Sequence, residues 1–186
     1  MKNLKTYIQN LTDLSEESWT ILCDCLTELK FEKGDRLLKV DEVCNSIFYI
    51  SLGQCKSFYN QDGKEINTAF YFENDFATNI KSLTSGIKSE YEIKACEHLT
   101  VLRFDKSKLL DAYKKSQEIE AFGRKLLELI IAKQEEHLDN FKLLTPQQRY
   151  ENLILKQPEF LQRVSLTQTA SYLGISRETL SRIRGK

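Results

Sequence analysis

Long apolar runs are absent from this 186-residue sequence, although 41% of its residues are hydrophobic. No stretch approaches the roughly 20 apolar residues that span a bilayer, and residues 1–11 lack the apolar segment of a signal peptide. We therefore expect a cytoplasmic protein without a membrane segment. The hydrophobic content is high enough for a buried core, which excludes general disorder.

Groups that bind metals or perform catalysis are scarce. The only histidines are His98 and His137, whereas a metal-dependent cupin needs two or three together with a carboxylate. No glycine-rich phosphate loop, nucleophile elbow or Cys–His pairing is visible, so we expect neither an enzyme nor a metal or cofactor site. An odd, scattered set of cysteines favours reduced thiols over a disulfide framework, with redox sensing by one thiol as the alternative. These residues are Cys23, Cys25, Cys44, Cys55 and Cys96.

Net charge is also lacking, because 27 basic residues balance 27 acidic ones. The charges are unevenly divided, however. Residues 142–186 contain eight basic and three acidic residues, a net charge of +5, and residues 1–141 carry −5. A basic C-terminal part is attracted to phosphate while an acidic N-terminal part is repelled. The neutral total is therefore no argument against a nucleic-acid partner.

Short strands are predicted between about residues 31 and 104. Runs rich in β-branched and aromatic residues alternate with glycine or aspartate corners, and Asp62-Gly63 is the clearest hairpin signal. Strands at this spacing predict an antiparallel β-barrel or jelly roll. The runs are Arg36–Val40, Ser46–Leu52, Cys55–Tyr59, Glu65–Phe72, Glu90–Ala95 and Thr100–Phe104.

Helices are predicted on both sides of the strands, over residues 12–30 with Ser15 as N-cap, 106–115 and 117–144. The last of these has two apolar stripes. One stripe can pack on the barrel; the other needs a second partner, and a copy of the chain is the simplest one. The alternative is a helix buried wholly within the chain. The first stripe is Ile119, Phe122, Leu126 and Leu129, and the candidate dimerisation stripe is Leu127, Ile131, Leu138 and Phe141.

Residues 165–186 have the spacing of a helix-turn-helix. Ala170 is the small residue where two helices cross, Gly174 allows the tight turn, and Ser176 caps the second helix. The second helix presents polar residues away from its apolar seam, namely Arg177, Glu178, Ser181 and Arg182. Arginine can donate to guanine and glutamate can accept from cytosine in the major groove. The segment therefore predicts a DNA reader; the alternatives are a Glu178–Arg182 surface ion pair and a protein-binding helix pair.

With barrel, long helix and this motif in order, nearly the whole chain resembles the Crp/Fnr superfamily of transcription regulators. The segment I-S-R-E-T-L-S-R-I at 175–183 is close to that family's recognition helix. K-G-D at 33–35, I-F-Y-I-S-L-G at 47–53 and D-F at 75–76 are similar to a cyclic nucleotide-binding domain. The resemblance implies base contacts by Arg177, Glu178 and Arg182, and a phosphate contact by Thr179. It also implies a homodimer on pseudo-palindromic double-stranded DNA, with RNA polymerase as a further candidate partner.

The nucleotide-binding positions of this family are altered. Its cyclic-nucleotide binders carry Gly-Glu after the D-F and Arg-Ser or Arg-Thr some ten residues later. Thr78-Asn79 and Ser89-Glu90 occupy these positions here, so the arginine is missing and a carboxylate lies beside the phosphate position. We expect weak or no cyclic AMP binding. The candidate contacts of another small effector are Phe76, Thr78, Asn79, Ser89 and Glu90.

The sequence thus predicts an α+β chain in three parts. These are a cyclic-nucleotide-binding-like antiparallel β-roll sensor domain over residues 1–115, a long connecting and dimerisation helix over 116–144, and a helix-turn-helix domain over 145–186. The expected function is sequence-specific transcription regulation with a degenerate effector domain. The alternative is a signalling module that binds a small ligand or a protein without reading DNA. Since only Gly185 and Lys186 follow the recognition helix, we expect no β-wing of the kind the family often has there.

Overall fold

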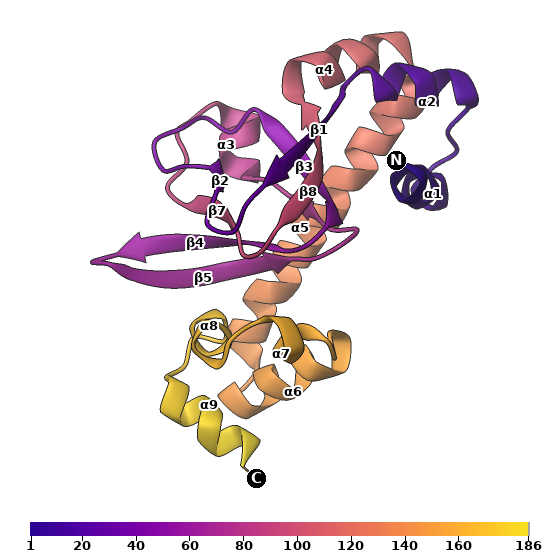
Figure 1. Cartoon of the computed structure of the whole chain (residues 1–186). Helices are drawn as coiled ribbons and strands as arrows, with labels where there is room; N and C mark the ends of the chain where they lie inside the picture. Colours follow the sequence, from indigo (N-terminus) through magenta and orange to yellow (C-terminus); the bar gives the residue numbers. More distant parts are fainter. Residues whose placement is uncertain (186) are drawn as a thin grey trace.

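The structure, a computed structural model, describes residues 1–185; Lys186, and with it part of the expectation about a wing, lies outside the described residues. Two four-stranded antiparallel sheets form a β-roll, with strand orders β1-β8-β3-β6 and β2-β7-β4-β5 (Figure 1). The predicted jelly-roll-like fold is confirmed. The strands are β1 (Leu26–Phe31), β2 (Arg36–Leu38), β3 (Ser46–Leu52), β4 (Cys55–Gln61), β5 (Lys64–Tyr71), β6 (Phe76–Ala77), β7 (Glu92–Ala95) and β8 (Leu99–Asp105).

The predicted hairpin is the connection between β4 and β5, which extends beyond the rest of the roll in Figure 1. Its two turn residues, Asp62 and Gly63, have φ angles of 52° and 82°. Positive φ at both positions gives the twist that suits a two-residue hairpin, and glycine adopts it without strain. The side-chain oxygen of Asn60 accepts the Gly63 amide at 3.0 Å and closes the turn.

The predicted helix over residues 12–30 is wrong at its C-terminal end. Helix α2 (Glu16–Cys23) begins at the expected cap, since Ser15 Oγ accepts the Ser18 amide, but the chain then turns into β1. Strand β1 pairs with β8 from Leu26 opposite Phe104 to Phe31 opposite Leu99, and this long-range pairing overrides the helical spacing. A helix that the sequence did not suggest, α1 (Lys2–Leu11), precedes α2.

The long helix α5 (Gln117–Leu143) lies along the outer face of the β1-β8-β3-β6 sheet (Figure 1). Of its predicted first stripe, Ile119, Phe122 and Leu126 are buried there and Leu129 is half-buried. The rings of Phe122 and of Phe104 in β8 lie 6.1 Å apart. The second stripe is left open: the exposed fractions of Ile131 and Leu138 are 53% and 57%. The helices α3 (Ile80–Ser85) and α4 (Lys106–Lys115) complete this part of the chain.

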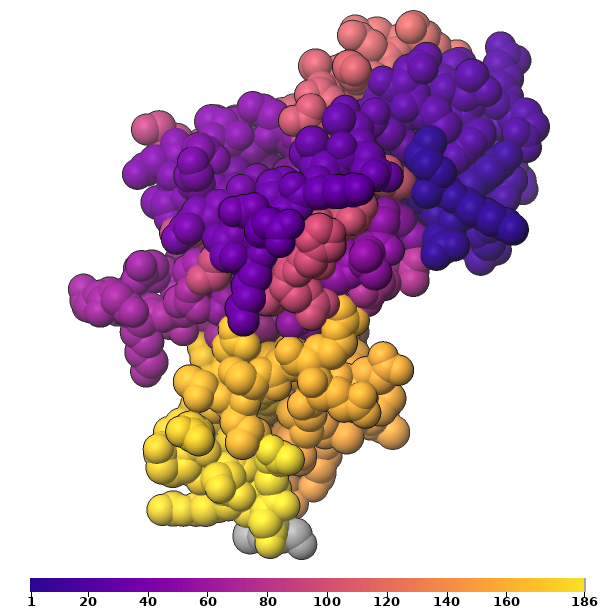
Figure 2. Space-filling view, in the orientation of Figure 1, coloured from indigo at the N-terminus to yellow at the C-terminus, as the bar shows by residue number. Residues whose placement is uncertain are grey.

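Four helices form a separate lobe below the roll, which Figure 2 shows in orange and yellow. Its first helix begins at Pro146, after a capping box in which Thr145 Oγ1 accepts the Gln148 amide. Leu153, Phe160 and Leu180 of the lobe belong to a second apolar core, to which Phe70 of β5 also contributes. The helices are α6 (Pro146–Lys156), α7 (Phe160–Arg163), α8 (Leu166–Tyr172) and α9 (Arg177–Arg184).

Candidate nucleic-acid interface

Helices α8 and α9 form the helix-turn-helix that the spacing predicts. Ala170 is buried where α8 meets α9, and its carbonyl accepts the Ile175 amide at 3.0 Å. Gly174 has a φ of 67°, a left-handed conformation that favours glycine, and so lets the chain reverse within the turn. Leu180 of α9 is fully buried against the lobe. The buried seam therefore fixes which side of α9 faces outward.

The start of α9 is held by its cap. Ser176 Oγ accepts the Thr179 amide at 3.1 Å, and the hydroxyls of these two residues lie 3.0 Å apart. Thr179 is half-buried and its hydroxyl is engaged in the cap. The other four predicted DNA contacts are exposed. These are Arg177, Glu178, Ser181 and Arg182.

The charged groups of α9 do not neutralise one another. Within the described residues, no ion pair joins Glu178 to Arg182 or engages Arg177. The backbone amide of Glu178 and the hydroxyl of Ser176 lower the pKa of the Glu178 carboxyl from its usual value, so this group remains an acceptor at neutral pH. Helix α9 lies at the end of the lobe away from the roll (Figures 1 and 2). The geometry leaves two guanidinium groups and a carboxylate available on one helix face.

An arginine just before α8 fastens the lobe to the roll. The guanidinium of Arg163 donates to both carboxylate oxygens of Glu73, at 2.6 and 3.1 Å, and to Glu97 at 2.5 Å. Its backbone carbonyl also accepts the side-chain amide of Gln54 at 3.1 Å. Burial alone would raise the pKa of Glu73, but hydrogen bonds from Arg163 and from the Gly53 amide outweigh it and lower that pKa.

Helix α8 itself packs on strand β5. The amide of Asn67 donates to Ser171 Oγ at 3.0 Å, and this hydroxyl donates to the carbonyl of Glu65 at 3.1 Å. Beside these bonds, Tyr172 contacts Phe70 of β5 edge to face and stacks on His137 of α5, with ring centroids 5.7 and 5.0 Å apart. The lobe is therefore joined to both the sheet and the long helix.

Because Arg163 pairs with Glu73, we expect the free energy of unfolding to depend on pH. Because the folded-state pKa of Glu73 is lowered, its contribution is complete above the unfolded value of about 4.3 and is lost as pH falls through the folded value. Arg163→Gln should therefore lower the free energy of unfolding at pH 7 by about 1–2 kcal/mol, a value discounted for partial exposure. Urea denaturation followed by circular dichroism should show this difference shrinking below about pH 4. Arg124→Gln, at an exposed position of α5, is the control; an equal effect at pH 7 and pH 3 would contradict the assignment.

Three of the predicted effector residues lie together inside the roll, and they bond to their surroundings. The side-chain amide of Asn79 donates to Ser89 Oγ at 2.8 Å, while its oxygen accepts the Ser82 amide and caps α3. Thr78 Oγ1 donates to the carbonyl of Ser46 at 2.9 Å. All three predicted residues are buried, so their polar groups already have partners within the chain.

The other two predicted effector residues lie elsewhere. Glu90 is exposed and pairs with Lys81 at 3.1 Å. Phe76 points to the outer face of its sheet, where its ring packs against Tyr7 of α1 and Tyr49 of β3 at centroid distances of 5.4 and 5.1 Å. The structure thus divides this predicted set between the interior, the surface and the opposite face of a sheet.

The cysteines and histidines form no metal-binding cluster in the described part of the chain. No group of three or more His, Cys, Asp or Glu side chains suited to a metal ion occurs among residues 1–185, and the five thiols are free. Burial raises the pKa values of Cys55 and Cys96, the latter to about 11, which disfavours the reactive thiolate. Across the same residues, no helix has both the length and the apolar character needed to cross a membrane.

Comparison with known proteins agrees with this geometry. Residues 28–116 match the cyclic nucleotide-binding domain family. A search of curated protein sequences finds no match. The fold is that of the Crp/Fnr transcription regulators, so the predicted resemblance is confirmed at the level of fold.

Three solved structures illustrate the likeness. FixK2 from Bradyrhizobium japonicum is 22% identical, with a TM-score of 0.71 over 86% of this chain and 83% of that one. A transcriptional regulator assigned to the Crp/Fnr family from Eubacterium rectale is 17% identical, with a TM-score of 0.69 over 92% and 82%. The catabolite activator protein of Thermus thermophilus is 16% identical, with a TM-score of 0.58 over 92% and 83%.

Proposed function

We propose that the chain is a sequence-specific DNA-binding transcription regulator that acts as a homodimer in the cytoplasm. The observation that carries this proposal is the exposed face of α9, where Arg177, Glu178 and Arg182 form no ion pair among the described residues. A helix so presented fits the major groove, in which the N-terminal residues of a recognition helix contact base edges. The three predicted parts then act as sensor (1–115), connecting helix (116–144) and reader (145–186).

The exposed stripe of α5 supports the homodimer. Leu127 is half-buried, Ile131 and Leu138 are more than half exposed, and with Gln134 between them these residues alternate at intervals of four and three. That spacing is typical of a two-helix seam. Two copies paired in this way would present their α9 helices to half-sites about 34 Å apart on a pseudo-palindromic operator.

A direct experiment separates this function from that of a signalling module that does not read DNA. DNA fragments bound by the full chain are selected from a random pool and sequenced, and their binding is measured by electrophoretic mobility. The proposal predicts an enriched pseudo-palindrome. Enrichment of no sequence, with binding that depends on salt alone, would favour the module, whose partner would be a protein or a small ligand. RNA polymerase and the small effector remain candidate partners of the regulator.

Cyclic AMP is expected not to be the effector. Ser89, at the position of the missing arginine, donates its Oγ to the carbonyl of Tyr91 at 2.6 Å, and Glu90, at the next position, places a negative charge beside it. A cyclic phosphate there would lack a cation and meet a carboxylate. Calorimetric titration of the chain with cyclic AMP should give no saturable heat at micromolar concentrations, as for AMP used as the control. A micromolar dissociation constant for cyclic AMP alone would refute this expectation.

A further inference from the structure

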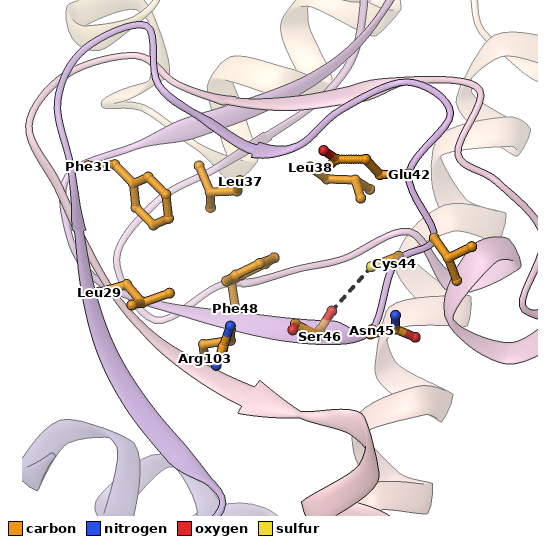
Figure 3. A pocket seen from close by; sticks show the side chains of 11 residues that line it. Leu29, Phe31, Leu37, Leu38, Glu42, Cys44, Asn45, Ser46, Phe48 and Arg103 are labelled. Carbon is orange, nitrogen blue, oxygen red and sulfur yellow. Dashed lines mark hydrogen bonds between the residues drawn. The ribbon is translucent and has the colours of Figure 1, made fainter.

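A cavity of about 280 Å³ lies between strand β2 and the inner face of the β1-β8-β3-β6 sheet (Figure 3). Its wall is about evenly divided between polar and apolar surface, and the polar side chains come from the segment 42–46 and from strand β8. The volume is slightly below the roughly 300–1,000 Å³ of sites for drug-sized ligands, so a smaller molecule suits it. The aliphatic and aromatic side chains of the lining are Leu29, Phe31, Leu37, Leu38, Val43 and Phe48.

One cationic side chain, Arg103 of β8, also lines this cavity. Arg103 lies opposite Phe48 on the neighbouring strand β3, on the inward face of the sheet. Its Nε is buried without a hydrogen-bond partner, and the guanidinium forms no ion pair with any residue from 1 to 185. Arg103 as a whole is half-buried, so its guanidinium is partly removed from water, and it lacks the carboxylate partners that Arg36 and Arg163 have.

The nearby carboxylates are already engaged. Asp105, two residues along β8, accepts the amides of Ser107 and Lys108 at the start of α4. Glu42, at the edge of the cavity, accepts the Lys39 amide at 3.1 Å and lies 3.9 Å from its ammonium group. Neither is bonded to Arg103, so a planar anion from outside the chain would be its natural partner.

We propose that this cavity binds a small apolar monocarboxylate. The carboxylate of the ligand pairs with the guanidinium of Arg103, and its hydrocarbon part packs among the leucine and phenylalanine side chains. A fork-shaped guanidinium matches a carboxylate through two parallel hydrogen bonds, and apolar walls favour a tail without polar groups. This site goes beyond the proposed function, because ligand binding here requires neither DNA binding nor dimerisation.

The site is distinct from the predicted effector positions, although one chain segment joins the two. Residues 42–46 form one wall of the cavity, and on that segment the Cys44 amide donates to Ser82 Oγ of α3 at 2.8 Å. The carbonyl of Glu42 accepts the amide of Ser89 at 2.8 Å, and that of Asn45 accepts the amide of Lys106 at 3.0 Å. A ligand in the cavity would therefore contact segment 42–46, which is itself hydrogen-bonded to α3 and to the start of α4.

Isothermal titration calorimetry of the full chain tests the proposal, with octanoate as probe and 1-octanol as its uncharged counterpart. Octanoate should bind saturably at one site per chain, and Arg103→Gln should weaken it roughly tenfold or more. Arg103→Lys keeps the positive charge but not the fork-shaped guanidinium. Its affinity for octanoate should lie between that of the unaltered chain and that of Arg103→Gln. Octanol should bind weakly and equally to all variants. Arg124→Gln, which removes an exposed arginine from α5, should bind octanoate as the unaltered chain does.

Methyl NMR of the unaltered chain locates the site even if Arg103→Gln fails to fold. Octanoate should shift the methyl signals of Leu29, Leu37 and Leu38 and leave those of Leu153 in the C-terminal lobe unchanged. The proposal is overturned by the absence of saturable heat with octanoate, by equal affinity of Arg103→Gln, or by shifts confined to other methyl groups. A chain that binds octanoate but enriches no DNA sequence would refute the proposed function and leave this site intact.

Discussion

Arg177→Ala is expected to relax the sequence preference of the protein at one base-pair position in each half-site. Arg177 is the first residue of α9, the proposed recognition helix; it is exposed and has no ion-pair partner in the described part of the chain. Losing one forked contact to a guanine costs about 1–3 kcal/mol of discrimination, which is roughly a 5- to 150-fold loss of affinity for the preferred site. Affinity for DNA without that site should change much less.

Fluorescence anisotropy at several salt concentrations, on operators selected with the unaltered chain, measures this effect. A lost base contact removes the difference between guanine and the other bases at one position, whereas a lost phosphate contact lowers the salt dependence and affects all sequences alike. Arg124→Ala provides the control, because its exposed side chain is on α5 and not on the reader. If operator preference is unchanged in Arg177→Ala and in Arg182→Ala, the assignment of base contacts to α9 is wrong.

Leu138→Glu should convert the proposed homodimer to a monomer. The side chain of Leu138 is 57% exposed in the single chain, so the substitution leaves the fold of each copy intact. In the paired helices, two glutamates would be buried against each other at the seam without partners. A buried unpaired charge costs about 3–5 kcal/mol, so the dimer dissociation constant should rise roughly a hundredfold or more.

Sedimentation velocity over a range of protein concentrations checks this prediction. Ala132→Glu introduces the same charge at an exposed position on the side of α5 away from the stripe, and should leave the dimer unchanged. A monomeric unaltered chain, or a dimer that tolerates glutamate at 138 as well as at 132, would show that the stripe is not the interface.

Local patterns were sufficient to predict most of the fold. Strand β3 has the predicted bounds, and the Asp62-Gly63 turn lies where its sequence indicates, because both depend on neighbours in the chain. The helix-turn-helix is predictable for the same reason, since Ala170, Gly174 and Ser176 act through a fixed spacing. The local pattern misleads where pairing with a distant strand overrides it. Leu26 and Leu29 have helical spacing from Leu22, yet they belong to strand β1 because β1 pairs with β8.

The contacts that join the parts of the chain could not be predicted. Arg163 meets Glu73 and Glu97, which are 90 and 66 residues away, and no spacing rule links them. Arg103 is an intermediate case. It follows Leu99 and Val101 at intervals of two, so the alternation within β8 would have placed it on the same inward face. Its lack of a partner, however, is visible only once the surrounding segments are in place.

Phe141 belongs to two surfaces, and this has a thermodynamic consequence. It is part of the stripe proposed for the dimer, and its ring lies against the turn of the reader, where a Cβ added to Gly174 would come within 2.7 Å of Phe141 Cε1. Arg149 of α6 also covers this ring at 4.6 Å. Any shift of Phe141 on pairing of the long helices must therefore be accommodated in the turn before α9. If the proposed dimerisation strengthens DNA binding by some factor, operator DNA must by reciprocity strengthen the dimer by the same factor.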